Sequence, residues 1–167
     1  MVNTKKWKVC ISACLLGFKY RYDGGSDFMP ELIAKYKDAV DFLPVCPEVE
    51  SGLPIPRKKM HLEASNRGTR LIVTETGEDR TDPMLAWADV KLDQIQRRAP
   101  AACILHSKSP CCGLCSAKLY NRNGRLLPSK GTGIFAGLLR LRFPDMPVCD
   151  ETEADALLRR LTGKPES

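Results

Sequence analysis

The chain has 167 residues, of which 43% are hydrophobic and 28% charged, as in an ordinary soluble globular protein. No apolar run approaches the roughly 18 residues needed to cross a bilayer, which argues against a helical membrane protein. The formal net charge of +6 favours an anionic partner only weakly, because the basic residues are spread along the chain. The length fits a single domain over residues 1–167. No signal-peptide segment precedes the first strand, so we expect a cytoplasmic protein.

The first third of the chain alternates apolar runs with turn-forming residues. Residues 8–12 are typical of a buried strand, and a glycine-rich loop follows at residues 17–25. Ser26 or Asp27 is predicted to cap a helix that runs to about Val40, with Leu32, Ile33 and Tyr36 on one face. Residues 41–45 form the second predicted strand. The proline-rich segment 47–57 is predicted to be a non-helical ordered loop, because proline interrupts helical hydrogen bonding.

The remaining elements continue this alternation. They begin with a strand that is antiparallel or at a sheet edge (71–74), a turn (77–79) and a helix (82–98) with Leu85, Ala88, Leu92 and Ile95 inward. A strand (101–106), a hairpin around residues 121–125, a helix (134–143), a strand (146–149) and a helix (152–161) capped by Asp150 and Glu153 follow. Strands that alternate with helices predict a Rossmann-like α/β fold, in which helices cover both faces of a mostly parallel sheet.

Eight cysteines are present, and in a reducing compartment they are not expected to form disulfides. Cys10 and Cys103 fall inside strands and are predicted to be core residues. Cys14, Cys46 and Cys112 each follow the C-terminal end of a strand, the edge where open α/β sheets place their ligand sites. Their spacing matches no zinc finger. Three thiolates without a fourth favour an iron–sulfur cluster with one open iron.

The other cysteines leave alternatives open. Cys112 and Cys115 bound a Cys-x-x-Cys pair that would suit zinc or a redox dithiol. A structural zinc module would use four thiols: Cys111, Cys112, Cys115 and Cys149. A nucleic-acid-binding protein that relies on the +6 charge is a third possibility.

Several polar residues lie beside the three cysteines of the predicted cluster site. Glu48 follows Cys46 by two residues and would serve as a general base or acid, although a solvated surface carboxylate is the plainer interpretation. Ser109 would donate a hydrogen bond to a substrate or simply cap a turn. Arg21, Arg57 and the helix start at Thr132 are candidates for binding an anion such as a 5′-phosphate.

Five short motifs, in this order along the chain, resemble those of the DUF523 family, which includes the thiouracil desulfidases called TudS. They are Ser12-Ala13-Cys14-Leu15-Leu16-Gly17, Arg21-Tyr22-Asp23-Gly24, Pro44-Val45-Cys46-Pro47-Glu48, Gly52-Leu53-Pro54-Ile55-Pro56-Arg57 and Ser109-Pro110-Cys111-Cys112-Gly113. The resemblance extends from about Val9 to Val148. It departs from the family pattern at Cys111, where a serine is usual, and at Cys115.

The resemblance implies a [4Fe-4S] cluster held by Cys14, Cys46 and Cys112, a catalytic carboxylate at Glu48 and an assisting serine at Ser109. It implies a non-redox desulfidase that converts thiouracil, or a thiouridine nucleotide, to the uracil compound and hydrogen sulfide. Relatives that act on tRNA carry an additional domain, so a free base or nucleotide is expected here, with no stable nucleic-acid partner. The oligomeric state is expected to be monomer or dimer.

Overall fold

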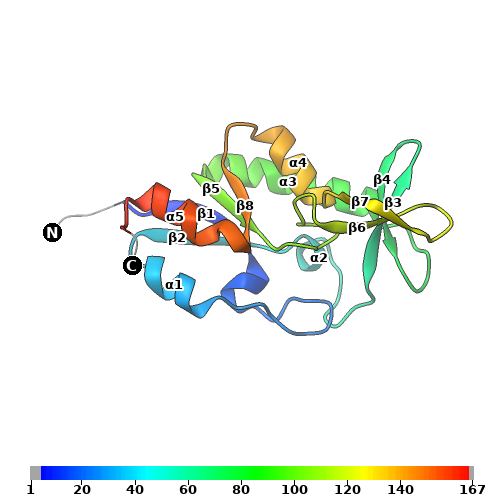
Figure 1. Cartoon of the computed structure of the whole chain (residues 1–167), viewed down its shortest axis with the longest axis horizontal. Coiled ribbons are helices and arrows are strands. Elements are labelled where there is room, and N and C mark those ends of the chain that lie inside the picture. The colour runs from blue at the N-terminus through cyan, green and yellow to red at the C-terminus, as the bar shows by residue number, and fades with distance from the viewer. Residues whose placement is uncertain (1–4, 166–167) are drawn as a thin grey trace.

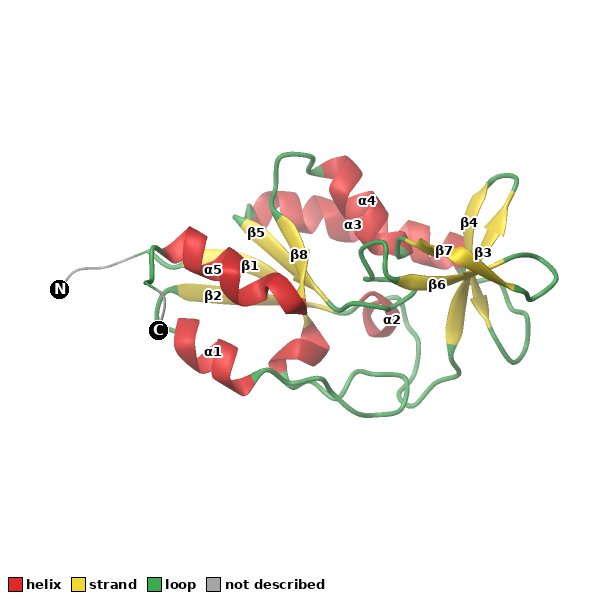
Figure 2. Ribbon diagram, viewed as in Figure 1, coloured by secondary structure: helices red, strands yellow, loops and turns green. Residues whose placement is uncertain are grey.

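The computed structural model describes residues 5–165, which form a four-stranded parallel sheet with a second four-stranded sheet at one end of the molecule (Figures 1 and 2). The parallel sheet has the order β2-β1-β5-β8. Its strands are β1 (Trp7–Ser12), β2 (Val40–Val45), β5 (Ala102–Leu105) and β8 (Val148–Asp150). The expected Rossmann-like α/β fold is confirmed.

Helices cover both faces of the parallel sheet, because alternate residues of its strands point to opposite sides. Val9 and Ile11 of β1 pack with the helices α1 (Pro30–Tyr36) and α5 (Ala154–Thr162). Cys10 points to the other face, toward α3 and α4. These two helices span Thr81–Arg98 and Ile134–Arg142.

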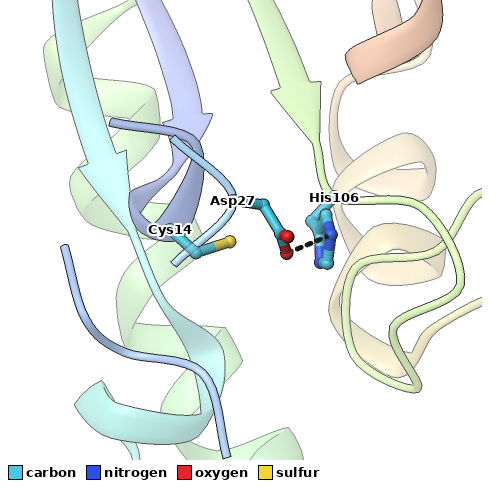
Figure 3. A group of neighbouring side chains, drawn as sticks. All are labelled: Cys14, Asp27 and His106. Carbon is cyan, nitrogen blue, oxygen red and sulfur yellow. Dashed lines mark ion pairs between the residues drawn. The ribbon is translucent and has the colours of Figure 1, made fainter. Parts of the chain in front are cut away.

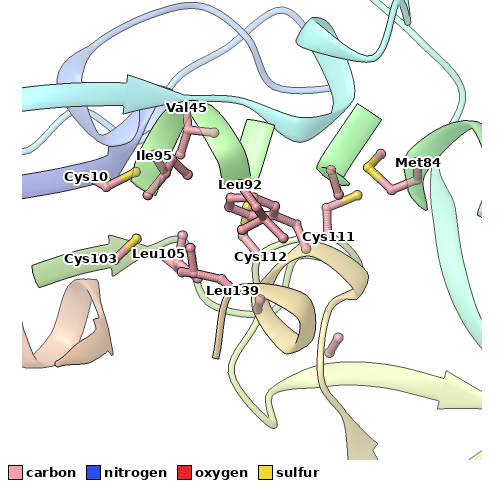
Figure 4. Close-up of a cluster of buried hydrophobic side chains, with 14 of the residues drawn as sticks. Cys10, Val45, Met84, Leu92, Ile95, Cys103, Leu105, Cys111, Cys112 and Leu139 are labelled. Carbon is pink, nitrogen blue, oxygen red and sulfur yellow. The ribbon is translucent and has the colours of Figure 1, made fainter. Parts of the chain in front are cut away.

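Cys10 and Cys103 are core residues, as predicted. They are register partners on β1 and β5 and are 2% and 0% exposed. Figure 4 shows both among the apolar side chains that fill the space between the sheet, α3 and α4.

The second sheet consists of two antiparallel hairpins joined by a parallel pair, in the order β4-β3-β6-β7. Its strands are β3 (Met60–Ser65), β4 (Gly68–Val73), β6 (Ala117–Tyr120) and β7 (Leu126–Gly131). The hairpin expected around residues 121–125 is confirmed, and β4 is antiparallel as expected. Leu62, Leu71 and Ala117 belong to the same hydrophobic cluster as α3 and α4, so the two sheets share one core.

Two expectations about helices are wrong. The segment 47–57 is not entirely non-helical, because Pro47–Glu50 forms the short helix α2. Pro47 occupies the first helical position, where the amide hydrogen that proline lacks has no intrahelical partner in any case. The helix expected from Ser26 or Asp27 begins instead at Pro30, for the same reason, and ends at Tyr36.

The inward face of α3 also differs from expectation at one position. Met84 is 1% exposed and packs in the core, whereas Leu85 is 39% exposed. The helix starts at Thr81, and the buried residues Met84, Ala88, Leu92 and Ile95 follow the spacing of one helical face. Asp150 caps the last helical segment as expected, since its carboxylate accepts a hydrogen bond from Thr152 N at 2.9 Å; that segment begins as the 3₁₀ turn η2 (Glu151–Glu153).

Among residues 5–165, no helix combines the length and the apolar character that a membrane crossing requires.

Candidate active site and metal centre

A cavity of about 520 Å³ lies at the carboxyl edge of the parallel sheet, between the ends of β1, β2 and β5 and the loop that enters β3. It is lined by seven of the eight residues expected to form the site, namely Cys14, Arg21, Cys46, Glu48, Arg57, Ser109 and Cys112. Thr132 is not among the lining residues, and its hydroxyl oxygen lies 3.2 Å from the exposed sulfur of Cys115.

Three neighbouring strands deliver the three cysteines to this cavity. Cys14 lies in the single 3₁₀ turn η1 (Ala13–Leu16) that follows β1, and Gly17 ends the turn with a φ of 95°, in the left-handed region that glycine adopts readily. Cys46 follows β2 and is the N-cap residue of α2. Cys112 lies in the turn after β5. Because β2, β1 and β5 are adjacent, their C-terminal ends bring the three sulfurs to one edge.

The turn that carries Cys112 is shaped by Ser109. Its hydroxyl oxygen accepts hydrogen bonds from the backbone N–H groups of Cys111 (3.1 Å) and Cys112 (3.0 Å). The N-terminus of α4 packs against the same turn, since Gly133 N donates to Gly113 O at 2.8 Å and Ala136 N donates to Cys111 O at 3.0 Å. These amides are therefore engaged by carbonyl groups of the turn, which argues against the expected anion contact at this helix start.

The thiols around the cavity interact electrostatically. Burial raises the pKa of Cys112 well above its usual range, and the neighbouring sulfurs of Cys46 and Cys14 raise it further. Burial, then the charges of Asp27 and Cys46, raise the pKa of Cys14 to about 12. Burial also raises the pKa of Cys46. The three groups thus lie close enough that an anion at one disfavours an anion at the next.

This donor set fits a metal centre. Thiols whose pKa values are raised by burial stay protonated in the protein alone, whereas a bound metal cation deprotonates a coordinating thiol outright. Thiolate ligands favour iron–sulfur clusters, zinc or copper(I). The three sulfurs border an open cavity, so a group held by them would keep one side accessible to a small molecule.

Glu48 is held beside the cysteines by a nearly buried arginine. Arg57 Nε donates to Glu48 Oε2 at 2.5 Å, and the two side chains are 5% and 15% exposed. The Arg57 guanidinium also donates to Tyr20 O at 2.7 Å and Pro54 O at 3.3 Å. Glu48 is therefore not the solvated surface acid of the plainer interpretation. The Arg57 contacts favour a role in positioning Glu48 over direct contact with a phosphate.

Cys111 is the fourth thiol of the cavity. It is fully buried, and burial raises the pKa of its thiol well above the usual range. The nearby charge of Glu48 adds to this rise. Cys111 thus faces the Glu48 carboxylate.

Sequence reasoning missed Asp27, which joins three segments of the site. Asp27 Oδ2 forms ion pairs with Arg21 Nη1 and, at 2.9 Å, with His106 Nε2. Its backbone N–H donates to Cys14 O at 3.1 Å. Ligand atoms of Cys14, Asp27 and His106 all lie within 4.8 Å of one another (Figure 3). Two of its partners could be noticed in the sequence: Arg21, on the same loop, and His106, at the end of the predicted strand 101–106.

Comparison with known proteins identifies the family. The family model for 2-thiouracil desulfurase matches residues 9–151. The chain belongs to the 2-thiouracil desulfurase family. A solved structure described as the [4Fe-4S]-dependent thiouracil desulfidase TudS (DUF523) is similar to this chain with a TM-score of 0.71 and 30% sequence identity, over 95% of this chain and 100% of that one. The Bacillus subtilis (strain 168) protein YbbK, described as uncharacterized, is 33% identical over 137 residues, or 79% of this chain and 89% of YbbK.

Membership of the 2-thiouracil desulfurase family makes this chain a C–S bond-cleaving enzyme. The family description implies a small thiolated pyrimidine as substrate.

Proposed function

We propose that this enzyme removes sulfur from thiouracil, or from a thiouridine nucleotide, and that a [4Fe-4S] cluster held by Cys14, Cys46 and Cys112 is its cofactor. The observation that carries the proposal is the convergence of these three thiols, of which Cys112 is buried and the other two are partly buried, on one cavity beside Glu48. The similarity to a structure described as a [4Fe-4S]-dependent desulfidase supports it.

The reaction exchanges sulfur for oxygen: the thiocarbonyl compound and water give the carbonyl compound and hydrogen sulfide, with no net oxidation or reduction. When bound, the cluster supplies a Lewis-acidic iron without a protein ligand, which favours departure of sulfide. Glu48 faces the cavity and takes a proton from the attacking water as general base. The same carboxylic acid then returns the proton as the C–S bond breaks.

Ser109 orients the pyrimidine in this proposal. Its oxygen already accepts two backbone N–H groups, so its own O–H remains available to donate into the cavity. Tyr20 and Tyr22 also line the cavity, so aromatic side chains border the space in which the pyrimidine would lie.

The cationic side chain proposed to meet a 5′-phosphate is Arg21, which lines the cavity and is more exposed than Arg57, and which also pairs with Asp23 and Asp27. Arg57 is committed to Glu48, and Thr132 lies outside the lining. A cytoplasmic location and a monomeric or dimeric state remain predictions.

The test is anaerobic reconstitution with iron and sulfide, followed by assay on 2-thiouracil, 4-thiouracil and their nucleotides. We expect iron and acid-labile sulfide in equal amounts, and release of hydrogen sulfide. Cys14→Ser, Cys46→Ser and Cys112→Ser should each lose the cluster, whereas Cys115→Ser, at an exposed sulfur outside the cavity, should retain it. Failure of zinc-free protein to take up iron and acid-labile sulfide would contradict the proposal.

Glu48→Gln should retain the iron content of the reconstituted protein and lower kcat by roughly 10²–10⁴-fold, the usual contribution of a general base. Normal turnover by this variant would remove Glu48 from the mechanism.

A further inference from the structure

A second group of metal-ligating side chains shares Cys14 with the proposed cluster site, and its other two members, Asp27 and His106, have no role in the mechanism above. Figure 3 shows the Cys14 sulfur pointing toward the Asp27 carboxylate, with the His106 ring on the far side of that carboxylate. The three ligand atoms lie within 4.8 Å of one another. They come from η1, from the loop before α1 and from the end of β5, so the fold and not the sequence brings them together.

The chemistry of the three donors matches a single divalent ion. Sulfur, imidazole nitrogen and carboxylate oxygen bind Zn²⁺ at about 2.0–2.3 Å, and ligands of a tetrahedral ion lie ~3.5 Å apart. Atoms that already lie within 4.8 Å need to move by only about 1 Å to reach that geometry. The thiolate and carboxylate would supply two negative charges to offset those of the ion.

The surroundings hold two of these donors in place before any ion binds. Asp27 Oδ2 is fixed between Arg21 Nη1 and His106 Nε2. An ion would replace the bridging hydrogen between the carboxylate and the imidazole, while Arg21 would remain as an outer contact that orients Asp27. Cys14 and His106 both line the cavity, so an entering ion has access and a water molecule can complete the coordination.

We propose that the cluster-free protein binds one Zn²⁺ ion through Cys14, Asp27 and His106. Cys14 is also a ligand of the proposed cluster, and one thiolate cannot be a terminal ligand of both groups. Zinc at this position therefore blocks cluster loading. This consequence rests on the proposed function, whereas zinc binding itself does not.

The experiment measures Zn²⁺ binding by anaerobic, reduced, cluster-free protein in competition with a chromophoric chelator. We expect one ion per chain, with affinity reduced about tenfold or more by Asp27→Asn and by His106→Gln. The matched controls are Asp145→Asn, at an exposed aspartate, and His61→Gln, at the other histidine of the chain; both should bind zinc like the parent protein.

Two serine variants separate the zinc site from the cluster site. Cys14→Ser should lose both zinc and the cluster, whereas Cys46→Ser should lose the cluster and retain zinc. Co²⁺ in place of Zn²⁺ should give a thiolate-to-cobalt charge-transfer band that Cys14→Ser abolishes. This band tests the site even if the Asp27 variant does not fold.

The zinc proposal is overturned if no ion binds with this stoichiometry, if Asp27→Asn and His106→Gln both bind like the parent, or if Cys46→Ser loses zinc as fully as Cys14→Ser. Failure of cluster reconstitution in zinc-free buffer would instead contradict the proposed function. Zinc-loaded protein should take up less iron than zinc-free protein; equal uptake would refute the competition.

Discussion

Arg57 shows how a single side chain positions the proposed general base, Glu48. It is 5% exposed, it contacts the backbone of two loops, and its Nε holds Glu48 Oε2. The planar guanidinium presents several donors in a fixed arrangement, whereas a lysine ammonium would be a point charge on a flexible stem. The direction in which Glu48 presents its carboxylate therefore depends on Arg57.

Arg57→Lys is expected to retain the cluster and lower kcat by roughly 10–100-fold, because a displacement of the base by about 1 Å has effects of this size. Iron content and single-turnover rates check the prediction. Lys58→Ala is the control, since its exposed pair with Glu75 lies outside the cavity lining. Unchanged kcat in Arg57→Lys would mean that Glu48 is oriented by other contacts.

The three cysteines and Glu48 were predictable as candidates from sequence, because each follows the end of a predicted strand. Their roles as ligands and base are still proposals. Asp27 was not predictable as part of the site, because a loop aspartate just before a helix ordinarily serves as a cap. Its contacts with Cys14 and His106 depend on how strands distant in sequence are arranged in the sheet.

The element that fixes the Cys111–Cys112 turn is the start of α4. A Cβ atom added at Gly133 would lie 2.4 Å from the carbonyl carbon of Cys111 and 2.7 Å from Cys112 N. Both are backbone atoms, so the turn itself would have to move. Further along the same helix, a Cβ at Gly137 would meet only Thr132 Cγ2, at 3.8 Å, which is ordinary contact.

Gly133→Ala should therefore destabilise the cluster-free protein by about 1–3 kcal/mol, as overpacking does, and reduce iron uptake on reconstitution. Gly137→Ala should leave iron uptake unchanged and stabilise by up to about 1 kcal/mol, because alanine is the better helix former. Urea unfolding of the two variants checks both expectations. Equal stability and equal iron uptake in the two variants would show that the start of α4 does not shape the Cys111–Cys112 turn.

Predictions at the level of elements succeeded where the periodicity was strong and failed at prolines. Pro47 and Pro30 each begin a helix, whereas the prediction treated the first as a breaker and placed the second inside a helix. The strand Met60–Ser65 was overlooked, although its apolar and polar residues alternate as in a half-buried strand. Without that strand, the second sheet could not be anticipated.

At the scale of the whole molecule, contacts between residues distant in sequence hold the layers together. On one face of the parallel sheet, Asp155 of α5 accepts hydrogen bonds from Lys35 Nζ at 2.8 Å and Tyr36 Oη at 3.0 Å, both on α1. On the other face, the two sheets share a single core with α3 and α4. The single-domain organisation expected for residues 1–167 remains a prediction.

The contact between α1 and α5 predicts a pH dependence of stability. The hydrogen bond from Lys35, with that from Arg159, lowers the pKa of folded Asp155 from 3.8 to about 2. A lowered folded-state pKa gives a stabilisation that is present above about pH 4 and is lost as pH falls toward 2. Asp155→Asn should lower the free energy of unfolding by less than about 1 kcal/mol at pH 7, since the side chain is 39% exposed.

The difference in free energy of unfolding between the parent and Asp155→Asn should shrink as pH falls from 4 toward 2. Urea unfolding of the cluster-free protein measures it. Asp89→Asn, at an exposed position of α3, is the control and should show no such trend. A free-energy difference that stays constant over this range would contradict the assigned ion pairs.

The order of the strands in the parallel sheet has a consequence for maturation during protein synthesis. Cys14 and Cys46 leave the ribosome early, on the adjacent strands β1 and β2, whereas Cys112 follows β5, and its turn is braced by Gly133 at the start of α4. The first two thiols must therefore wait until roughly four-fifths of the chain has been translated before the third can join them. If the proposed cluster is bound by these three cysteines, delivery of iron and sulfide is therefore expected late in synthesis or after it.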